Sequence, residues 1–502
     1  MSKNIFNTVK MTKPSRNVFD LSHDVKLSCN MGQLVPTLMM ECVPGDKFNL
    51  SCESLLRFAP LVSPVMHRCD VTMHYFFVPN RILWPSWEDY ITNTKTGGVL
   101  PAYPTTVMDA GHYTRLCDHI GIPNPGLAES ETVSALPFAA YQAIYNEYYR
   151  DQNLIDEVPY ELNDGDNTAN TELTVFRNRC WEHDYFTAAL PFAQKGEPVS
   201  LPLGQFGDVP VRLNQDVYDD TTLDGTPADV FIAKGEIEPA PSPLDPDQVY
   251  AKTSQLTGQA ATINDLRTAF RLQEWLEKAA RAGSRYIESI LSHFGVRSSD
   301  KRLQRPEYIT GTKSPVVISE VLNTTGTAEA PQGSMAGHGV AVTSGGYGSY
   351  YCEEHGYIVG IMSIMPKTAY QQGIERHFLK HTDPFQYYWP EFAHLGEQEI
   401  ANREIYAFQG GTGDDTFGYI PRYSEYKYMQ NRVSGDFRTD LDFWTMARIF
   451  TAPPSLNDDF VISTPTHRIF AVTDPAKDKM WCQILHKITA VRSMPKFGTP
   501  TF

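Results

Sequence analysis

The sequence predicts a mainly β protein, a sandwich or barrel of strands interrupted by helical excursions. Apolar and polar residues alternate with a period of two within the first 80 residues, and strand-like segments return after residue 315. Between these regions, apolar residues recur at helical spacing. The chain has 502 residues, of which 41% are hydrophobic and 12% aromatic, which is ample for a packed interior. We therefore expect a large β core with helices in its long loops.

The first strands are expected near the N-terminus. In FDLSHDVKLSC (19–29) every second residue is apolar or His, which gives a sheet one core face and one face in water. Pro44-Gly45-Asp46 predicts a turn. The alternation resumes after this turn at Phe48, Leu50 and Cys52. VTMHYFFVPN (71–80) predicts a further strand that ends at Pro79-Asn80.

Helices are expected in the long connection that follows. PFAAYQAIYNEYYRD (137–151) has helical spacing, and a short helix at 284–295 should end at Gly295. The clearest helix is TINDLRTAFRLQEWLEKAARAG (262–283). Thr262 and Asp265 resemble a capping box at its start. Leu266 and Phe270 begin an apolar stripe, and Gly283 predicts the end of the helix.

Residues 205–260 have a different composition, rich in Pro and Asp and with little periodicity. Such a composition disfavours both helix and central strand. We therefore expect an exposed insertion that projects from the main body.

The remaining strands are expected in the last third of the chain, at 316–321, 357–365, 468–472 and 481–491. The segment 357–365 is apolar on both faces, as a strand covered on both sides would be. Two glycine-rich stretches, 333–339 and 344–351, are interpreted as flexible loops.

The charge is strongly acidic overall but uneven. A net charge of −16 argues against a protein dedicated to binding free nucleic acid, but it does not exclude one locally basic face. Residues 1–19 and 479–502 carry Lys and Arg without any acidic residue. Eight cysteines show no CxxC pair and no zinc spacing, which predicts reduced, mostly buried thiols. Neither a signal peptide nor a membrane helix is expected.

Catalytic and metal-binding motifs are not supported. The chain has no P-loop and no GxSxG elbow. His377 and His381 lie four residues apart, as two metal ligands on a helix would, but HExxH and a third ligand are missing. NDGDN (163–167) lacks the EF-hand spacing and is interpreted as a solvated turn. We expect no enzyme activity, no metal and no cofactor.

One segment concentrates aromatic residues and positive charge. FGYIPRYSEYKYMQNRVSGDFR (417–438) interleaves Phe and Tyr with Arg and Lys. Three interpretations are open at this point. The segment can be a stacking surface for single-stranded nucleic acid, a protein interface rich in Tyr and Arg, or an ordinary loop.

Several long stretches resemble the major capsid protein of gokushovirus-type microviruses (Microviridae). They are 74–91, 181–196, 262–309, 355–378, 417–438 and 494–502. The resemblance covers almost the whole chain except 205–260, where this family has a variable insertion. It implies a single jelly-roll β-barrel domain over 1–502, with long helix-containing loops and with 205–260 as an exposed projection at the three-fold axes.

The same resemblance implies a function. The chain should self-assemble into a T=1 icosahedral shell around a circular single-stranded DNA phage genome, after synthesis in the cytoplasm of a bacterial host. Implied partners are copies of itself, the genome, internal scaffolding, pilot and small basic DNA-binding proteins, and a host-cell surface receptor, without membrane insertion. The alternative is a β-sandwich receptor-binding or carbohydrate-binding phage protein, which would not form large closed particles.

Two groups of residues are candidates for the surfaces of such a shell. Tyr423, Tyr426, Tyr428 and Arg432 are expected mainly at subunit contacts, with genome stacking second and an ordinary loop third. Lys487, Arg492 and Lys496 belong to the acid-free C-terminal segment and are expected to face the genome. The alternative for these cations is solvation of an outer edge strand, a common use of Lys.

Overall fold

The structure is a computed structural model that describes 15–92, 99–124, 126, 129–196, 199, 263–283, 285–324, 332–408 and 413–497, with four short strands inside 205–260. The chain divides into two compact units, Met1–Ala193 with Ala279–Phe502, and Gln194–Lys278. The predicted insertion at 205–260 belongs to the second unit. Apart from the backbone of those short strands, it lies outside the described residues.

The first unit is built on two antiparallel sheets. The larger has the order β1-β18-β4-β14-β13, with β2 pairing β18 beyond the end of β1. Its strands are β1 (Asn17–Asp20), β2 (His23–Cys29), β4 (Lys47–Phe58), β13 (Val317–Leu322), β14 (Met335–Tyr351) and β18 (Met480–Arg492). The predicted strand 19–29 is thus divided at Leu21-Ser22, and the turn at Gly45 has the expected left-handed backbone, with φ +93°.

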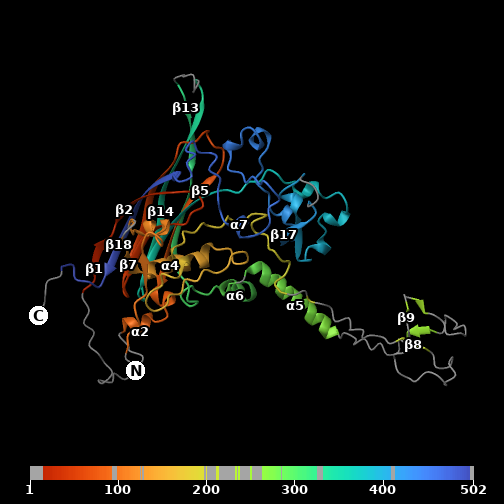
Figure 1. Ribbon diagram of the computed structural model, residues 1–502, viewed down its shortest axis with the longest axis horizontal. Coiled ribbons are helices and arrows are strands. Elements are labelled where there is room, and N and C mark those ends of the chain that lie inside the picture. Colours follow the sequence, from red (N-terminus) through yellow and green to blue (C-terminus); the bar gives the residue numbers. More distant parts are fainter. Residues whose placement is uncertain are drawn as a thin grey trace. The chain divides into compact units, whose positions relative to one another are not determined.

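The smaller sheet has the order β12-β5-β15-β3. Its strands are β3 (Val35–Cys42), β5 (Cys69–Pro79), β12 (Glu307–Pro315) and β15 (Gly356–Pro366). Figure 1 shows the strands of both sheets running alongside one another. Because inward-facing residues of both sheets pack into one apolar cluster, the two sheets form a sandwich. Along β4, for example, alternate residues from Phe48 to Phe58 are buried. The predicted jelly-roll class is confirmed.

A layer of helices covers the outer face of the smaller sheet. α4 (Leu136–Ile144) continues as a π-helical turn, Tyr145–Tyr149, and packs on β5 and β15 (Figure 1). Along β15, Ile358 and Met362 face the sandwich core, whereas Val359 and Ile361 face the helical layer. The prediction of a strand covered on both sides is confirmed.

The other elements lie in loops between the strands or in the second unit. The helices are α1 (Asn80–Leu83), α2 (Trp87–Ile91), α3 (Arg115–Ile120), α5 (Ile263–Ala282), α6 (Tyr286–Phe294) and α7 (Asp458–Val461), with short 3-10 helices at Thr171–Thr174, Arg376–Phe378, Pro384–Gln386, Pro390–Phe392, Asn402–Glu404, Ser424–Tyr426, Gly435–Arg438 and Asp442–Trp444. The strands are β6 (Thr105–Met108), β7 (Glu131–Ser134), β8 (Val211–Leu213), β9 (Ile232–Ala233), β10 (Glu236–Ile237), β11 (Val249–Ala251), β16 (Glu397–Ala401) and β17 (Thr416–Pro421).

The predicted helix ends are correct. α5 stops before Gly283 and α6 before Gly295, and both glycines have a positive φ. Thr262, the predicted first residue of the capping box, lies outside the described residues. The predicted apolar stripe of α5 is not covered by the described part of the chain, since Leu266 and Phe270 are exposed.

Two predictions about the late part of the chain are wrong. The glycine-rich stretches interpreted as flexible loops lie almost entirely in β14. Glycine is needed there for close packing, because a Cβ at Gly337 would lie 2.2 Å from the Ser63 carbonyl oxygen and one at Gly339 would lie 2.8 Å from the Phe58 ring. The predicted strand 468–472 is a loop, apart from a single bridge at Phe470. Its Arg468 guanidinium donates to carbonyls of the 442–447 loop, which holds the backbone away from a sheet.

All eight cysteines are free thiols, and all except Cys180 are buried. Among the described residues, no helix combines the length and apolar character that a membrane span needs.

Candidate functional site

The aromatic segment 417–438 is partly interior to its own chain. Its first residues form β17, which pairs with β16. Phe417 and Ile420 are buried in an apolar cluster that also includes Phe186 and Phe460. Phe417 therefore builds the protomer core and is not available to a partner.

Tyr423 follows β17 and precedes the exposed tyrosines. Its own side chain is buried, with 4% of its surface accessible. Its backbone is left-handed, with φ +64°, a conformation that costs free energy for a non-glycine residue. Local contacts offset that cost. The Tyr423 N–H donates to Gln398 Oε1 over 2.9 Å, and its ring lies 5.0 Å from the ring of Tyr388. Tyr423 therefore supports the surface from beneath.

Tyr426 and Tyr428 lie on the surface, with 55% and 40% of their area accessible. The Tyr426 ring is 6.1 Å from the Tyr423 ring, and Lys380 Nζ lies 3.9 Å from its centroid. Lys380 is buried and forms an ion pair of 2.6 Å with Glu425 Oε1. Burial favours a higher pKa for Glu425, but hydrogen bonds from Lys380 and Gln398 outweigh it, so the pKa is lowered. The position of Tyr426 is thus fixed by a charged pair within the protomer.

Arg432 lies apart from this tyrosine group. Its exposed guanidinium is 3.9 Å from Glu375 Oε1, and its backbone forms a bridge with Tyr370. The structure therefore brings Tyr423 and Tyr426 together but places Arg432 beside a different segment.

A neighbouring aromatic segment was missed by the sequence prediction. FQYYWPEF (385–392) presents exposed rings, and Tyr388 lies 6.4 Å from Tyr426. Lys380 Nζ also lies 6.0 Å from the Tyr387 ring. The aromatic residues of this segment are evident in the sequence, but no Lys or Arg is interleaved with them as in 417–438. We call these exposed residues the aromatic surface: Phe385, Tyr387, Tyr388, Trp389, Tyr426 and Tyr428.

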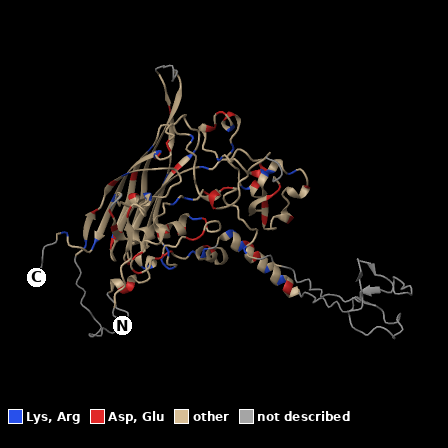
Figure 2. Ribbon diagram, viewed as in Figure 1, with Lys and Arg blue, Asp and Glu red and all other residues tan. Residues whose placement is uncertain are grey.

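The C-terminal cations are not free of acidic neighbours in space. Lys487 on β18 forms an ion pair with Glu53 on β4. Arg492 Nε lies 3.2 Å from the buried carboxylate of Asp46, and its guanidinium also donates to the Glu41 carbonyl. Lys496 is exposed. Figure 2 shows acidic and basic positions interspersed along the strands, so a run without acids in the sequence does not make a basic face.

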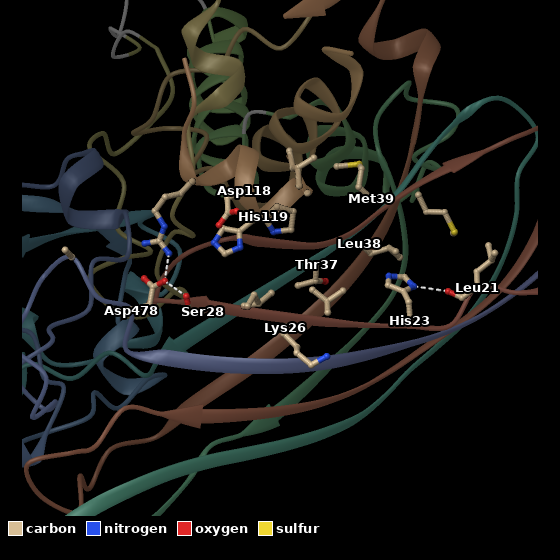
Figure 3. A pocket seen from close by; sticks show the side chains of 18 residues that line it. Leu21, His23, Lys26, Ser28, Thr37, Leu38, Met39, Asp118, His119 and Asp478 are labelled. Atoms are coloured by element: carbon tan, nitrogen blue, oxygen red, sulfur yellow. Dashed lines mark hydrogen bonds and ion pairs between the residues drawn. The ribbon is translucent and has the colours of Figure 1, made fainter. Parts of the chain in front are cut away.

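A hollow of about 810 Å³ lies where β2 and β3 face each other under α3 (Figure 3). Figure 3 shows Asp118 and His119 across the hollow from His23 and Lys26. Arg115 beside it forms an ion pair of 2.7 Å with Asp478. Burial, followed by the positive charge of Arg115, lowers the pKa of His119. The Ser28 hydroxyl on the wall of the hollow donates to Asp478 Oδ2 over 2.6 Å (Figure 3). Because Arg115 pairs with the same oxygen, we interpret this contact as structural, a link between β2 and the loop before β18.

Two segments of the sequence, 377–381 and 163–167, carry possible metal ligands. His377 lies in a single 3-10 turn beside Glu375, so it does not share a helix face with His381. In NDGDN, the Asn167 amide bonds to the backbone of its own turn, and Asp164 accepts a hydrogen bond of 2.7 Å from Trp84. In the described part of the chain, no group of three or more His, Cys, Asp or Glu is placed to hold a metal ion.

The relatives of the chain identify its family. Residues 7–502 match the family described as capsid protein (F protein). The chain belongs to this capsid protein family. It is 35% identical to capsid protein VP1 of Bdellovibrio phage phiMH2K and 33% identical to capsid protein VP1 of Chlamydia phage 1. Both alignments cover 99% of this chain and 97% of the relative, and capsid protein VP1 of Spiroplasma virus 4 is 29% identical over the same shares.

These similarities confirm the resemblance to gokushovirus capsid proteins. The chain is a major capsid protein, a structural component of the virion and not an enzyme. For a capsid subunit, exposed aromatic residues are more readily explained by contacts with other subunits than by an isolated binding site.

Proposed function

We propose that this capsid protein self-assembles into a T=1 icosahedral shell that encloses a circular single-stranded DNA genome. The whole-chain match to the capsid protein (F protein) family supports the proposal, as does the jelly-roll sandwich. A closed shell also needs surfaces that stay exposed in the isolated protomer and become buried between copies. The aromatic surface is exposed in the isolated protomer, and this exposure is the observation that carries the proposal.

The aromatic surface is suited to a protein contact. Monomeric proteins rarely expose large contiguous apolar patches, and Tyr, Trp and Phe are enriched where protein surfaces meet. Tyr426 is held in place by Lys380 and by packing on Tyr423, so little side-chain entropy is lost when a partner covers it. We therefore assign Tyr426 and Tyr428 to a subunit contact. Tyr423 packs beneath Tyr426, and we assign Arg432 to the edge of the same contact.

The test replaces Tyr426 and Tyr428 together by Ala. Particle yield should fall at least tenfold, as measured by sedimentation of the assembled fraction, while the far-ultraviolet circular dichroism of the unassembled chain stays unchanged. Tyr347→Ala is the matched control, because Tyr347 on β14 is equally aromatic, highly exposed and distant in sequence from this surface. Normal particles that have lost their DNA would instead favour base stacking by these tyrosines.

The C-terminal segment is proposed to face the genome. A chain of net charge −16 needs cations on any surface that lines a DNA-filled cavity. The ion pair with buried Asp46 gives Arg492 a structural role. The proposed contact with phosphate therefore falls mainly to Lys487 and Lys496, whose side chains are exposed.

The insertion 205–260 is proposed to form an exposed projection at the three-fold axes that recognises a host-cell receptor. Its Pro-rich, acidic composition and its place in the separate compact unit Gln194–Lys278 support this assignment. Replacement of 205–260 by a short Gly/Ser linker should leave a soluble chain with native-like circular dichroism. Loss of folding would place the segment in the jelly-roll core, contrary to the proposal.

Further partners are proposed from the family alone. They are an internal scaffolding protein, a pilot protein and a small basic DNA-binding protein, with synthesis and assembly in the cytoplasm of a bacterial host. Co-purification of these proteins with particles, or with assembly intermediates, tests each one separately.

A further inference from the structure

The strand β13 is an edge of the larger sheet. It pairs with β14 on one side, and no described strand pairs with its other side. The strand arises where the chain changes sheets. β12 ends at Pro315 in the smaller sheet, the Val316 N–H donates to the Cys69 carbonyl over 2.8 Å, and the chain then joins the larger sheet. In Figure 1, β13 and the adjoining part of β14 reach past the other strands of this sheet.

The hydrogen-bond register identifies the backbone groups that are free on this edge. The Asn323 N–H donates to the Ser334 carbonyl over 2.9 Å, which continues the β13–β14 register. In an antiparallel ladder such bonded pairs alternate with unbonded pairs. Val317, Ser319 and Val321 therefore direct their N–H and C=O groups toward β14. Ile318, Glu320 and Leu322 direct theirs toward the open edge.

The side chains of β13 are also uncovered. Val317, Val321 and Leu322 expose 66%, 51% and 53% of their area. Natural edge strands are usually guarded by Lys, Pro or a bulge against pairing with another strand. The sequence VISEVL has none of these guards, and Glu320 is its single charge. An apolar, unguarded edge of this kind is a template for another strand.

We propose that β13 pairs with β13 of a second copy of this chain, antiparallel and across a two-fold axis centred on Ser319. The proposal rests on the proposed self-assembly, which brings copies of the chain together. A second copy is the favoured occupant because the strand is complementary to itself in this register. Val317 lies opposite the partner subunit's Val321, and Glu320 lies opposite the partner subunit's Ile318, so the two carboxylates do not face each other.

Other registers fit less well. A centre on Glu320 would place two carboxylates directly opposite each other, which is destabilising. A centre on Val317 would require the Val316 N–H, which already donates to Cys69. A centre on Val321 would pair fewer residues of the strand. With the centre on Ser319, Ile318 and Glu320 exchange backbone hydrogen bonds with the partner, and the two larger sheets become continuous.

The register gives a direct test by cross-linking. At an unbonded pair of an antiparallel ladder the Cα atoms are about 4.5 Å apart, within the range of a disulfide. Ser319→Cys particles treated with diamide should therefore yield mostly disulfide-linked dimers on a non-reducing gel. Ser344→Cys is the matched control, because Ser344 is exposed on the same face of the sheet, on β14 opposite Glu53, and should give at least tenfold less dimer.

The outcomes separate this proposal from the proposed function. If the parent chain forms particles but Ser319→Cys chains in such particles stay monomeric after oxidation, the β13 pairing is overturned and the shell is not. If the parent chain forms no particles, the proposed self-assembly fails.

A second variant covers the case in which Ser319→Cys does not assemble. Val321→Lys adds a charged guard to the edge and should reduce particle yield at least tenfold while the unassembled chain keeps its circular dichroism. Normal particle yield from Val321→Lys would also overturn the pairing.

Discussion

The strands β15 and β13 belong to the same sandwich but are stabilised in different ways. β15 lies between two apolar clusters, one inside the sandwich and one under α4, so its chain supplies all its contacts. β13 has apolar side chains of similar type, yet most of its surface is exposed. Burying the apolar side chains of either strand away from water is favourable. The difference indicates that burial at β15 is complete within the protomer. Under the proposed self-assembly, β13 and the aromatic surface are buried by other copies.

The largest effect on the stability of the protomer is expected for a buried residue of β15. Ile361→Ala removes a fully buried side chain of β15 and leaves a cavity under the helical layer. The free energy of unfolding of the unassembled chain should fall by about 2–5 kcal/mol. Urea denaturation followed by circular dichroism measures the change.

The matched substitution on the exposed strand is Val321→Ala. Because half of the Val321 side chain is already in water, the free energy of unfolding should change by no more than about 0.5 kcal/mol. If the two variants lose the same free energy of unfolding, β13 is as buried as β15 in the unassembled chain, contrary to this account.

A second prediction concerns pH and the interior of the sandwich. His486 on β18 accepts a hydrogen bond from the Tyr75 hydroxyl at Nδ1 and donates from Nε2 to the Thr37 carbonyl, so it joins the two sheets as a neutral ring. Burial, followed by the charge of His23, lowers its pKa to about 4. In the unfolded chain the pKa is near 6.5. Below pH 6.5 the unfolded chain therefore binds a proton that the folded chain does not.

The stability from this ring is complete above pH 6.5 and is lost as the pH falls toward 4. Its loss should amount to about 3 kcal/mol at pH 4, because the pKa of the ring is about 4 in the folded chain and near 6.5 in the unfolded chain. His486→Gln should remove this part of the pH dependence, as measured by urea denaturation at pH 7 and pH 4. A variant whose stability falls as steeply as the parent's would show that another group causes the loss.

The last pair of variants extends the comparison to the C-terminal cations. Lys487→Gln with Lys496→Gln should flatten the logarithmic salt dependence of DNA retention in gently opened particles by about 1.4, the value for two lost phosphate contacts to a single strand. Arg492→Gln should instead destabilise the chain, because it leaves the buried Asp46 carboxylate without its ion pair. A salt slope unchanged in the double variant would exclude both lysines from the genome contact.

Much of the fold could be predicted from local patterns, and the failures have physical causes. The strands at 48–58 and 481–491 alternate strictly because one face of each is buried in the sandwich. β14 was not predicted because its glycines suggested a loop. They are needed where the strand packs closely against Phe58 and Ser63, and no local pattern reveals such contacts. β12 was missed because its sequence EYITGTKSP is largely polar, with only intermediate burial.

The candidate sites were harder to predict because they depend on contacts between distant segments. Tyr423 and Tyr426 were selected correctly as aromatic neighbours, but the interior position of Tyr423 depends on Gln398 and Tyr388. Likewise, the C-terminal cations looked unpaired in the sequence, whereas Asp46 and Glu53 reach them from the region of β4. Local charge and composition do not identify such partners.

The mass of the particle formed by the purified chain tests the central claim most directly. A T=1 shell contains sixty copies, and sixty copies of a 56.5 kDa chain give a mass of about 3.4 MDa without DNA. Native mass measurement of empty particles should give a single population at this value. A distribution limited to monomers and small oligomers, or a closed particle with a different number of copies, would contradict the proposed shell.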